Sequence, residues 1–592
     1  MRTYLLLCLS LIHATTGLPA SAQELTDKTR VEELMSRGEI PGLGLAVVSS
    51  NGVNVHIFGD ARVGEKPANE ETVFEAASLT KPVVAYIVMR LVEQGKLKLD
   101  DSLIAILPSL PLPKEDSRSK LVTVRMSLSH MSGLEGPDNQ TLSFAENPGT
   151  KFRYYPAGYR LVQRVVEHLE KTDLETIAKR EVFSPLGMDS SSLVYKPESA
   201  NRLATRHNLL SEPIEKVRDP QRPANAAASL FTTAGDYGRF LKEMLMPTGL
   251  QEKTVNMMLQ PQIEVDDTDG AVAWGVGWGL EPKRGTFFHW GDDGAAKCFT
   301  IGSRSKGQAM VYFTNSFHGM CIADDMARRL IDSESPAVEW LDYHKWDSVF
   351  RTARQDILRA FVDEGPEAGL SLFNEYQKAH SDLDMSKIAR WMSWLLGGRS
   401  LYAERITMLN WQVERDPENL DLYLNLLQAH QGIDSSDVIQ SQLAKELMPL
   451  AFRQEDDVVL NNVAWFFAMN PDGNGRYLRT EDAVEVARKA CKISPDNANW
   501  KNTLGATLFR NGNYDEAIEV CNESVNQGFD VVYNWLFLAM SHWRLNDFDE
   551  AKKWHAKSME WKTQFSDQVS GNPELKSLFG ELEKTRDSVR SR

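Results

Sequence analysis

The chain has 592 residues, of which 42% are hydrophobic and 25% are charged, close to the average of globular proteins. Its length suits about three to four domains, and its composition excludes a wholly disordered chain, a collagen-like chain and a small disulfide scaffold. The formal net charge of -16 repels phosphate backbones and no basic stripe stands out, so nucleic acid is not an expected partner.

The N-terminal stretch 1–22 has the pattern of a signal peptide. Arg2 precedes a short apolar run at 5–12, and Ala-Ser-Ala at 20–22 is a small-residue cleavage site. The run is shorter than the roughly 20 residues that span a bilayer. An uncleaved anchor or a buried N-terminal helix is the alternative. We expect a secreted or periplasmic chain without a transmembrane anchor after cleavage.

Residues 23–345 mix strand and helix patterns. Two β-rich runs at 43–50 and 53–59 are separated by Asn51-Gly52, a strong hairpin signal. Three more strand-like runs, joined by short turns, lie within 287–315. The segment between these two sets is mainly helical and loop-like. We therefore expect an α/β domain with one antiparallel sheet built from both of its ends, flanked by helices and carrying a helical insert.

The stretch 74–96 carries the S-x-x-K motif Ser78-Leu79-Thr80-Lys81, where a helix is expected to begin. A spacing of three residues places Ser78 and Lys81 on one helix face, one turn apart. A serine hydroxyl is a poor nucleophile without a nearby base, and a lysine supplies that base when burial keeps it partly neutral. A serine helix cap followed by a surface lysine is the structural alternative.

Three further stretches follow in order along the chain. They are H-x-S-G-L at 130–134, Tyr154 between an extended segment and a helix, and His-Trp-Gly at 289–291 on a strand. Together with the S-x-x-K motif they closely resemble the serine β-lactamase-like family, which comprises class C β-lactamases, D-alanyl-D-alanine carboxypeptidases and related serine esterases. The resemblance covers about 30–335 and implies the family's α/β fold and a serine hydrolase.

The resemblance also implies roles for individual residues. Ser78 is the nucleophile that becomes acylated, and Lys81 and Tyr154 share the general-base role, with Tyr154 placed to protonate the leaving group. The charge of Lys81 is expected to lower the pKa of Tyr154 enough for this role. The backbone N–H groups of Ser78 and Asp292 form the oxyanion hole, and Gly291 lets its strand approach the substrate.

Structural alternatives remain for the aromatic members of this set. Tyr154 is alternatively a packed aromatic residue, and His289 alternatively only hydrogen-bonds its own strand. His130, the first residue of H-x-S-G-L, is expected to be a turn or capping residue rather than a catalyst.

Departures from the family's motifs bear on the substrate. Pro156 replaces the family's amide-recognising asparagine, and His289 with the bulky Trp290 replaces its lysine and threonine. A histidine is only partly charged at neutral pH, and Asp292 and Asp293 add negative charge. We therefore expect an esterase or peptidase rather than an efficient β-lactamase.

The chain from 350 onward is helical in pattern and partly repetitive. The stretch 504–517 aligns with 538–551 at a period of 34, with small residues and an aromatic residue at fixed places. These features resemble tetratricopeptide repeats. We expect such repeats at 461–564, degenerate helical repeats at 350–460 and a C-terminal tail at 565–592. An array of this kind offers a concave surface to a protein or peptide, and a brace on the first domain is the alternative.

Four cysteines remain after the leader: Cys298, Cys321, Cys491 and Cys521. The first two and the last two are candidate disulfide pairs, and free buried thiols are the alternative for both. No Cys/His cluster has zinc spacing, and we expect no metal or organic cofactor. The substrate is expected to be a small-molecule or peptide acyl compound. The competing hypothesis for the whole chain is a catalytically degenerate β-lactamase-like binding module joined to a tetratricopeptide interaction scaffold.

Overall fold

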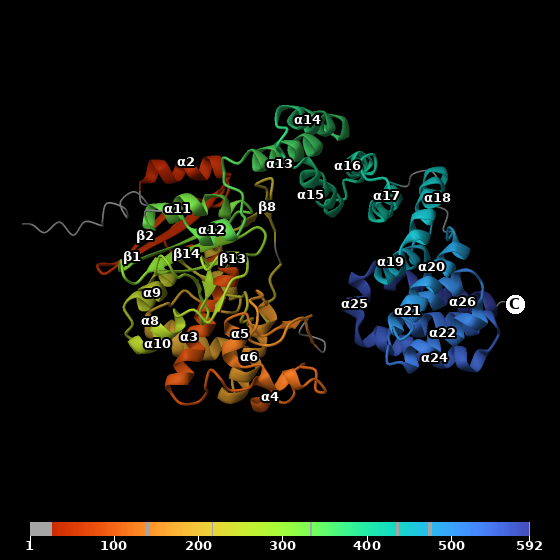
Figure 1. The fold of residues 1–592 in the computed structure, drawn as a ribbon, viewed down its shortest axis with the longest axis horizontal. Helices are drawn as coiled ribbons and strands as arrows, with labels where there is room; N and C mark the ends of the chain where they lie inside the picture. Colours follow the sequence, from red (N-terminus) through yellow and green to blue (C-terminus); the bar gives the residue numbers. More distant parts are fainter. Residues whose placement is uncertain are drawn as a thin grey trace, which may run out of the picture. The chain divides into compact units, whose positions relative to one another are not determined.

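The computed structural model describes residues 27–136, 142–215, 217–331, 334–433, 437–471 and 476–590. The predicted signal peptide at 1–22 lies outside these residues. The chain forms two compact units that divide between Thr352 and Ala353 (Figure 1).

A nine-stranded antiparallel sheet forms the centre of the first unit. Its strand order is β10-β11-β12-β13-β14-β15-β1-β2-β3, so the first strands of the unit share one sheet with the last ones, as predicted. The strands are β1 (Gly42–Ser49), β2 (Gly52–Arg62), β3 (Lys66–Pro67), β10 (Ile263–Glu264), β11 (Ala273–Trp274), β12 (Gly279–Glu281), β13 (Thr286–Asp292), β14 (Lys297–Ser303) and β15 (Gln308–Thr314).

The predicted hairpin joins β1 and β2. Ser49 pairs with Gly52, so the two turn residues are Ser50 and Asn51, and Gly52 begins the second strand rather than completing the turn. Gly52 has a φ of 135°, which residues with a side chain rarely adopt.

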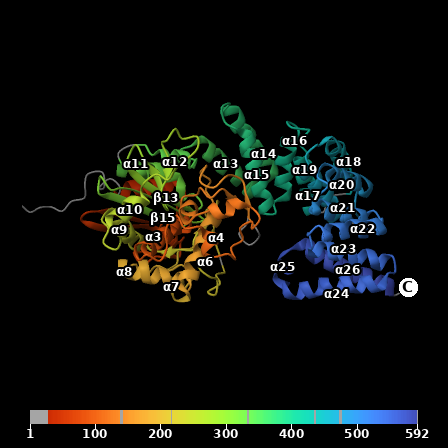
Figure 2. The same ribbon diagram turned by 60° about the horizontal axis from the view of Figure 1, so that its bottom comes forward.

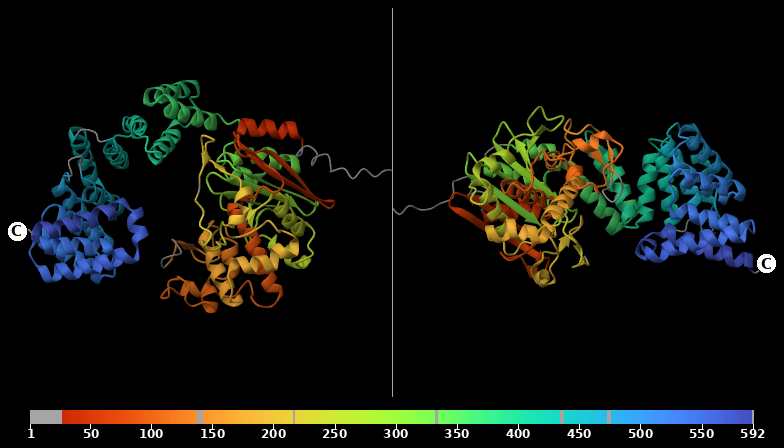
Figure 3. Two further views of the ribbon diagram at one scale, coloured as in Figure 1. Left: turned by 180° about the vertical axis from the view of Figure 1, so that it is seen from behind. Right: turned by 90° about the horizontal axis from the view of Figure 1, so that it is seen from below.

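Alternate residues of β1 pack on opposite faces of the sheet, as the two-residue period of a strand requires. Leu43, Leu45 and Val47 join the core beneath α2 (Lys28–Gly38) and α11 (Ala323–Ile331). Ala46 and Val48 join the larger core that contains α3 (Thr80–Glu93) and α9 (Ala234–Leu245). Figure 1 shows α2 and α11 on one side of the strands and α3 and α9 on the other, and Figure 3 shows the red strands β1 and β2 beside the green strands of the same sheet.

The segment between the two groups of long strands supplies the helices of the larger core and several two-residue strands. Besides α3 and α9, its helices are α4 (Leu103–Ile106), α5 (Val124–Leu128), α6 (Pro156–Glu170), α7 (Leu174–Ala178), α8 (Ser184–Leu186) and α10 (Glu252–Met258). Helix α3 is buried at nearly every position from Thr80 to Leu91, so the helix that follows Ser78 lies inside the unit rather than on its surface. The short helix α12 (Pro336–Trp340) follows the sheet.

The second unit is helical throughout its described residues (Figure 2). Its helices, beginning with one that spans the division between the units, are α13 (Val349–Arg359), α14 (Pro366–Ala379), α15 (Met385–Gly398), α16 (Tyr402–Val413), α17 (Leu420–Gly432), α18 (Asp437–Arg453), α19 (Asp457–Met469), α20 (Thr480–Ile493), α21 (Ala498–Arg510), α22 (Tyr514–Asn526), α23 (Val532–Arg544), α24 (Phe548–Gln564), α25 (Ser566–Gly571) and α26 (Pro573–Arg590).

The first residues of these helices recur at the predicted repeat period. Helices α20, α22 and α24 start at Thr480, Tyr514 and Phe548, and each start follows the previous one by the interval that separates the aligned stretches 504–517 and 538–551. The starts of α21 and α23 are separated by the same interval. Gly505 allows α21 to approach α22 closely, because a Cβ there would lie 2.3 Å from Cys521 Sγ. The region therefore fits a repeat-like solenoid, and its assignment to tetratricopeptide repeats remains a prediction.

The expected C-terminal tail is helical instead. Helix α26 occupies 573–590 and lies alongside α23 (Figure 2). Four of its apolar side chains are buried: Leu575, Leu578, Phe579 and Leu582. The prediction of a tail was wrong because these residues recur at helical spacing and find an apolar face to cover.

The structure also decides between disulfide pairs and free thiols for the four cysteines. Cys298, Cys321, Cys491 and Cys521 are free thiols, and burial raises the pKa of each. Buried thiols with a raised pKa are poor nucleophiles, so these cysteines act as small apolar residues of the two units.

Candidate active site

Ser78 lies in the turn that leads into helix α3. The 3-10 turn Ala77–Leu79 precedes the helix, and Ala77 has a left-handed φ of 43°, which costs a residue with a side chain roughly 1–2 kcal/mol. Thr80 holds this turn, because its Oγ1 donates to the Ala77 carbonyl at 2.6 Å and accepts from the Leu230 amide at 2.9 Å. A strained turn held by its neighbours presents Ser78 in a defined position.

Lys81 is a buried amine in contact with that serine. Its Nζ donates to Ser78 Oγ and to the Ala227 carbonyl, both at 2.8 Å. Burial and, to a smaller extent, the positive charge of Arg160 lower the pKa of Lys81 to about 7. The alternative of a serine cap with a surface lysine is therefore wrong, and the neutral amine that a general base requires is well populated at neutral pH.

Tyr154 lies beside this pair, with its ring centroid 5.0 Å from Lys81 Nζ. Its hydroxyl is buried and has no hydrogen-bond partner among the described residues. Burial raises the pKa of Tyr154 and outweighs the opposite effect of the nearby Ser78 hydroxyl. The lowered pKa expected of a tyrosine base is therefore not found, because burial penalises the phenolate. Tyr154 is suited to donate a proton rather than to accept one.

Strand β13 runs past the turn that carries Ser78. A Cβ on Gly291 would lie 2.4 Å from the Ala76 carbonyl oxygen and 2.5 Å from Cys298 Sγ. The Cys298 thiol donates to the same carbonyl at 3.2 Å. Only glycine fits at this position, so Gly291 brings the strand close to the backbone before Ser78, as expected of a strand that lines the site.

The two aspartates at the end of β13 are paired. Asp292 accepts from Lys297 Nζ at 2.5 Å and from the Tyr343 hydroxyl at 2.6 Å. Asp293 forms an ion pair with Arg206. We expected Asp292 and Asp293 to add negative charge beside the site, but Lys297 and Arg206 compensate that charge. The role of the Asp292 backbone N–H as an oxyanion donor remains a prediction.

His289 is an uncharged ring at this site. It is completely buried, and burial together with the charge of Lys81 lowers its pKa to about 3. Its Nδ1 lies 2.9 Å from the backbone nitrogen of Trp290, and its Nε2 has no partner among the described residues. The Trp290 ring stacks on His289 at 5.3 Å and contacts the Tyr154 ring at 4.9 Å. The partial charge expected of His289 at neutral pH is therefore absent.

The structure thus brings Ser78, Lys81, Tyr154, His289, Trp290 and Gly291 together, although they come from three distant segments. Pro156, two residues after Tyr154, is the first residue of α6. Proline is favoured at that helical position because its missing N–H would have no partner there. The residue that replaces the family's asparagine therefore serves the start of a helix.

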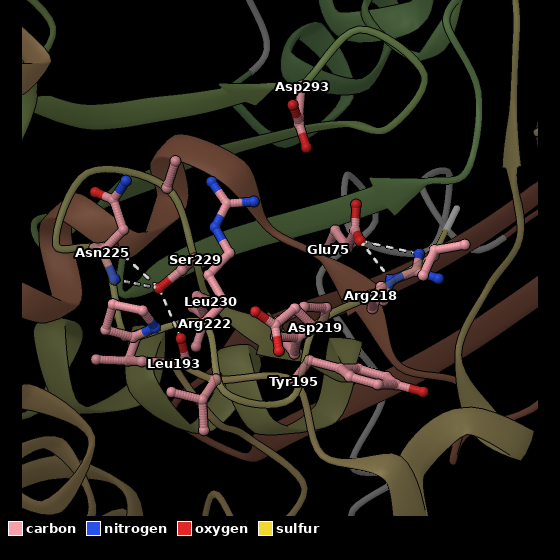
Figure 4. Close-up of a pocket in the computed structure, with 15 residues that line it drawn as sticks. Glu75, Leu193, Tyr195, Arg218, Asp219, Arg222, Asn225, Ser229, Leu230 and Asp293 are labelled. Carbon is pink, nitrogen blue, oxygen red and sulfur yellow. Dashed lines mark hydrogen bonds and ion pairs between the residues drawn. The ribbon is translucent and has the colours of Figure 1, made fainter. Parts of the chain in front are cut away.

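A cavity of about 280 Å³ is lined by near neighbours of the cluster in the sequence, but by none of its six residues. It is lined from separate segments by residues that include Glu75, three positions before Ser78, and Asp293, next to Asp292 (Figure 4). Arg206 and Arg218 both donate to the Glu75 carboxylate, the latter at 3.0 Å. Sequence reasoning missed these charged residues, because no motif marks them and 131 positions separate Glu75 from Arg206.

Neither a metal centre nor a membrane span is found in the part of the chain that the structure describes. There, no three His, Cys, Asp or Glu side chains gather as metal ligands would. No helix in the same residues has the length and apolar character needed to cross a bilayer.

The comparison with known families agrees with this geometry. Residues 28–333 match the family model described as Beta-lactamase. The chain belongs to the beta-lactamase family. Penicillin-binding protein 4 of Amycolatopsis lactamdurans is 26% identical to it over 341 residues, which are 51% of this chain and 88% of that protein. Esterase EstB of Burkholderia gladioli is 26% identical over 272 residues, 37% of this chain and 68% of that protein.

Solved structures are similar over between 52% and 57% of the chain. A class C beta-lactamase is 19% identical with a TM-score of 0.46, over 54% of this chain and 98% of its own. The beta-lactamase family match confirms the predicted family and the α/β fold of the first unit. It supports serine acyl-enzyme hydrolysis as the general type of activity, since the relatives include a penicillin-binding protein and an esterase.

Proposed function

We propose that this chain is a serine hydrolase that acts through an acyl-enzyme on Ser78. The contact that carries the proposal is the 2.8 Å hydrogen bond between Lys81 Nζ and Ser78 Oγ, made by a buried amine whose pKa is about 7. A nucleophile touching a base that is neutral at working pH is the arrangement that nucleophilic catalysis needs.

In the proposed reaction, neutral Lys81 accepts the Ser78 proton while Oγ bonds to the substrate carbonyl carbon. The backbone N–H groups of Ser78 and Asp292 stabilise the negative oxygen of the tetrahedral intermediate. Tyr154 then gives its phenolic proton to the leaving group as the carbonyl re-forms, and the proton held by Lys81 returns to Tyr154. Water enters in place of the leaving group and releases the acid by the same steps in reverse.

The proposed substrate is an ester or peptide rather than a carboxylate-bearing β-lactam. His289 is neutral, so it lacks the positive charge that would attract a carboxylate at this place. Two further residues disfavour a β-lactam substrate. Trp290 is bulky, and Pro156 has no side-chain group that could hydrogen-bond a substrate amide. The cavity beside Glu75 is the proposed place of the acyl group.

The test is labelling of the full chain with a fluorophosphonate, followed by intact mass measurement and peptide mapping. We expect one adduct, on Ser78, its loss in Ser78→Ala and its retention in the control Ser199→Ala. Turnover of p-nitrophenyl acetate should exceed that of nitrocefin and should disappear in Ser78→Ala. A folded chain that forms no adduct at any pH between 5 and 9 would refute the proposal and favour the degenerate binding module.

We also propose that the chain is exported, since residues 1–22 have the signal-peptide pattern described above. N-terminal sequencing of the protein recovered outside the cytoplasm measures this. A mature chain that begins at Gln23 is the expected result, and a chain retained with Met1 intact contradicts it.

A further inference from the structure

His130 occupies a backbone position that is costly for a histidine. It follows helix α5 with a left-handed φ of 56°, and its side chain is only 1% exposed. Glycine and asparagine are the usual residues at such a place after a helix, and another side chain costs roughly 1–2 kcal/mol there. A strained, buried residue next to a reaction centre points to a function for its side chain.

Three contacts join His130 to Tyr154 and its neighbours. The His130 carbonyl accepts from the Arg153 amide at 2.7 Å, and its Nδ1 accepts from the Tyr155 amide at 3.0 Å. Its ring stacks on the Tyr154 ring with centroids 4.3 Å apart and planes 30° apart. One residue therefore binds the backbone on both sides of Tyr154 and restrains its ring.

The same contacts exclude His130 as a proton acceptor. The Nδ1 lone pair is occupied by the Tyr155 N–H, which places the ring proton on Nε2. Burial and the charge of Lys81 hold the pKa of His130 well below its usual range, so the ring stays neutral. Tyr159 and Trp274 contact it at centroid distances of 5.3 Å each and limit its movement.

We propose that His130 is a positioning residue for proton transfer, which holds the Tyr154 hydroxyl where the leaving group departs. This inference rests on the proposed function, in which Tyr154 is the proton donor. The proposal gives the histidine of H-x-S-G-L a role beyond forming a turn, since glycine or asparagine would suffice for the turn alone.

The test compares two acetate esters that differ in their leaving group. An alkyl alcohol must be protonated as it leaves, whereas p-nitrophenolate is stable without a proton, so a displaced Tyr154 slows the alkyl ester selectively. The variants are His130→Gly and His130→Asn, which both adopt the left-handed φ without strain. Asparagine keeps an acceptor for the Tyr155 N–H, and glycine does not. Tyr154→Phe is the reference, and His318→Asn, at another buried histidine, is the control.

We expect His130→Gly to lower kcat/KM for the alkyl ester about 10- to 100-fold more than for the p-nitrophenyl ester, because a displaced Tyr154 loses part of the roughly 100- to 10,000-fold that a well-positioned general acid contributes. His130→Asn should recover most of this selective loss, added imidazole should recover part of it in His130→Gly, and His318→Asn should show none.

The outcomes distinguish failure of the positioning role from failure of the proposed function on which it rests. Equal losses on both esters in folded His130→Gly, or no loss, while Tyr154→Phe remains selective, would overturn the positioning role alone. A Tyr154→Phe variant that treats both esters alike would overturn the proton-donor assignment itself. Circular dichroism and melting temperatures establish that each variant is folded, and a His130→Asn variant that shows the full selective loss contradicts the role given to Nδ1.

Discussion

At the scale of single residues, the buried amine of Lys81 determines how the proposed reaction depends on pH. Its neutral form is the base, so acylation of Ser78 should rise about tenfold per pH unit below pH 7 and level off above it. Arg160→Gln removes a positive charge that lowers the pKa of Lys81, and it should move the midpoint to higher pH. Rapid-mixing measurement of acylation between pH 5 and 9 tests both statements, and a flat profile contradicts them.

The same residue should weaken the fold at low pH. The pKa of Lys81 falls from 10.5 in the unfolded chain to about 7 in the folded one, so the folded state binds the proton less tightly. The cost of the buried ammonium is on the order of 5 kcal/mol below pH 7, diminishes between pH 7 and 10.5, and vanishes above that range.

Lys81→Met tests this cost, because it keeps the length of the side chain and removes the charge. After allowance for two lost hydrogen bonds, each worth about 1 kcal/mol, the variant should be more stable than the parent by about 3 kcal/mol at pH 6. At pH 10 most of the cost of the ammonium is gone, so the variant should be less stable by about 1 kcal/mol. Denaturant unfolding at the two pH values measures it. Equal stability at both would mean that the ammonium is solvated.

At the scale of elements, helix α26 covers a face of α23 that would otherwise be exposed. Residues 534–543 of α23 are all buried, and ten consecutive residues pass through every side of a helix. Arg510 of α21 reaches across to Glu581 of α26 at 2.5 Å, with only 3% of its side chain exposed. The face of α23 is therefore occupied by the chain's own C-terminal helix, and a partner of the repeats would need another surface or would need to displace α26.

Helix α26 should contribute to the stability of the second unit. Leu578→Ala removes a side chain that is 1% exposed and should cost about 2–5 kcal/mol, whereas the exposed Ser577→Ala should change little. Thermal unfolding of the full chain, followed by circular dichroism, compares the two. Identical melting curves would show that α26 is a loose tail after all.

At the scale of the whole molecule, the two units have separate apolar cores. The two largest cores of the first unit draw their buried residues from between Val31 and Val338, and that of the second unit from between Leu420 and Leu582. Units with their own cores fold independently to a good approximation. The first unit nevertheless extends beyond the boundary at 345 that the sequence indicated: Arg351 is 4% exposed and donates to the Gly38 carbonyl at 2.9 Å.

Fragments of the first unit should reflect this extension. A fragment 27–345 lacks Arg351 and also Trp346, whose Nε1 donates to Asp325 at 2.9 Å. It should melt several degrees below the fragment 27–359, since about 1 kcal/mol shifts a domain of this size by roughly 2–4 °C. Both fragments should be labelled on Ser78 by a fluorophosphonate. Equal melting temperatures would place the end of the unit at 345.

The sequence by itself determined the features that depend on local spacing. The S-x-x-K turn, the hairpin at Asn51 and the repeat period of the helical region each follow from the spacing of residue types along the chain, and the ordered motifs identified the family. The finer division of the helical region into repeats remains a prediction.

Only the tertiary structure decided the electrostatics and the packing between distant segments. Burial raises the pKa of Tyr154, and burial together with the charge of Lys81 makes His289 neutral. Asp292 is paired with Lys297 of the neighbouring strand and with Tyr343. The ion pairs around Glu75 and the packing of α26 on α23 likewise could not be predicted from residue spacing, since they join residues that only the fold brings together. The sequence therefore supplies the residue types of this site, and the environment in the folded chain sets their protonation states.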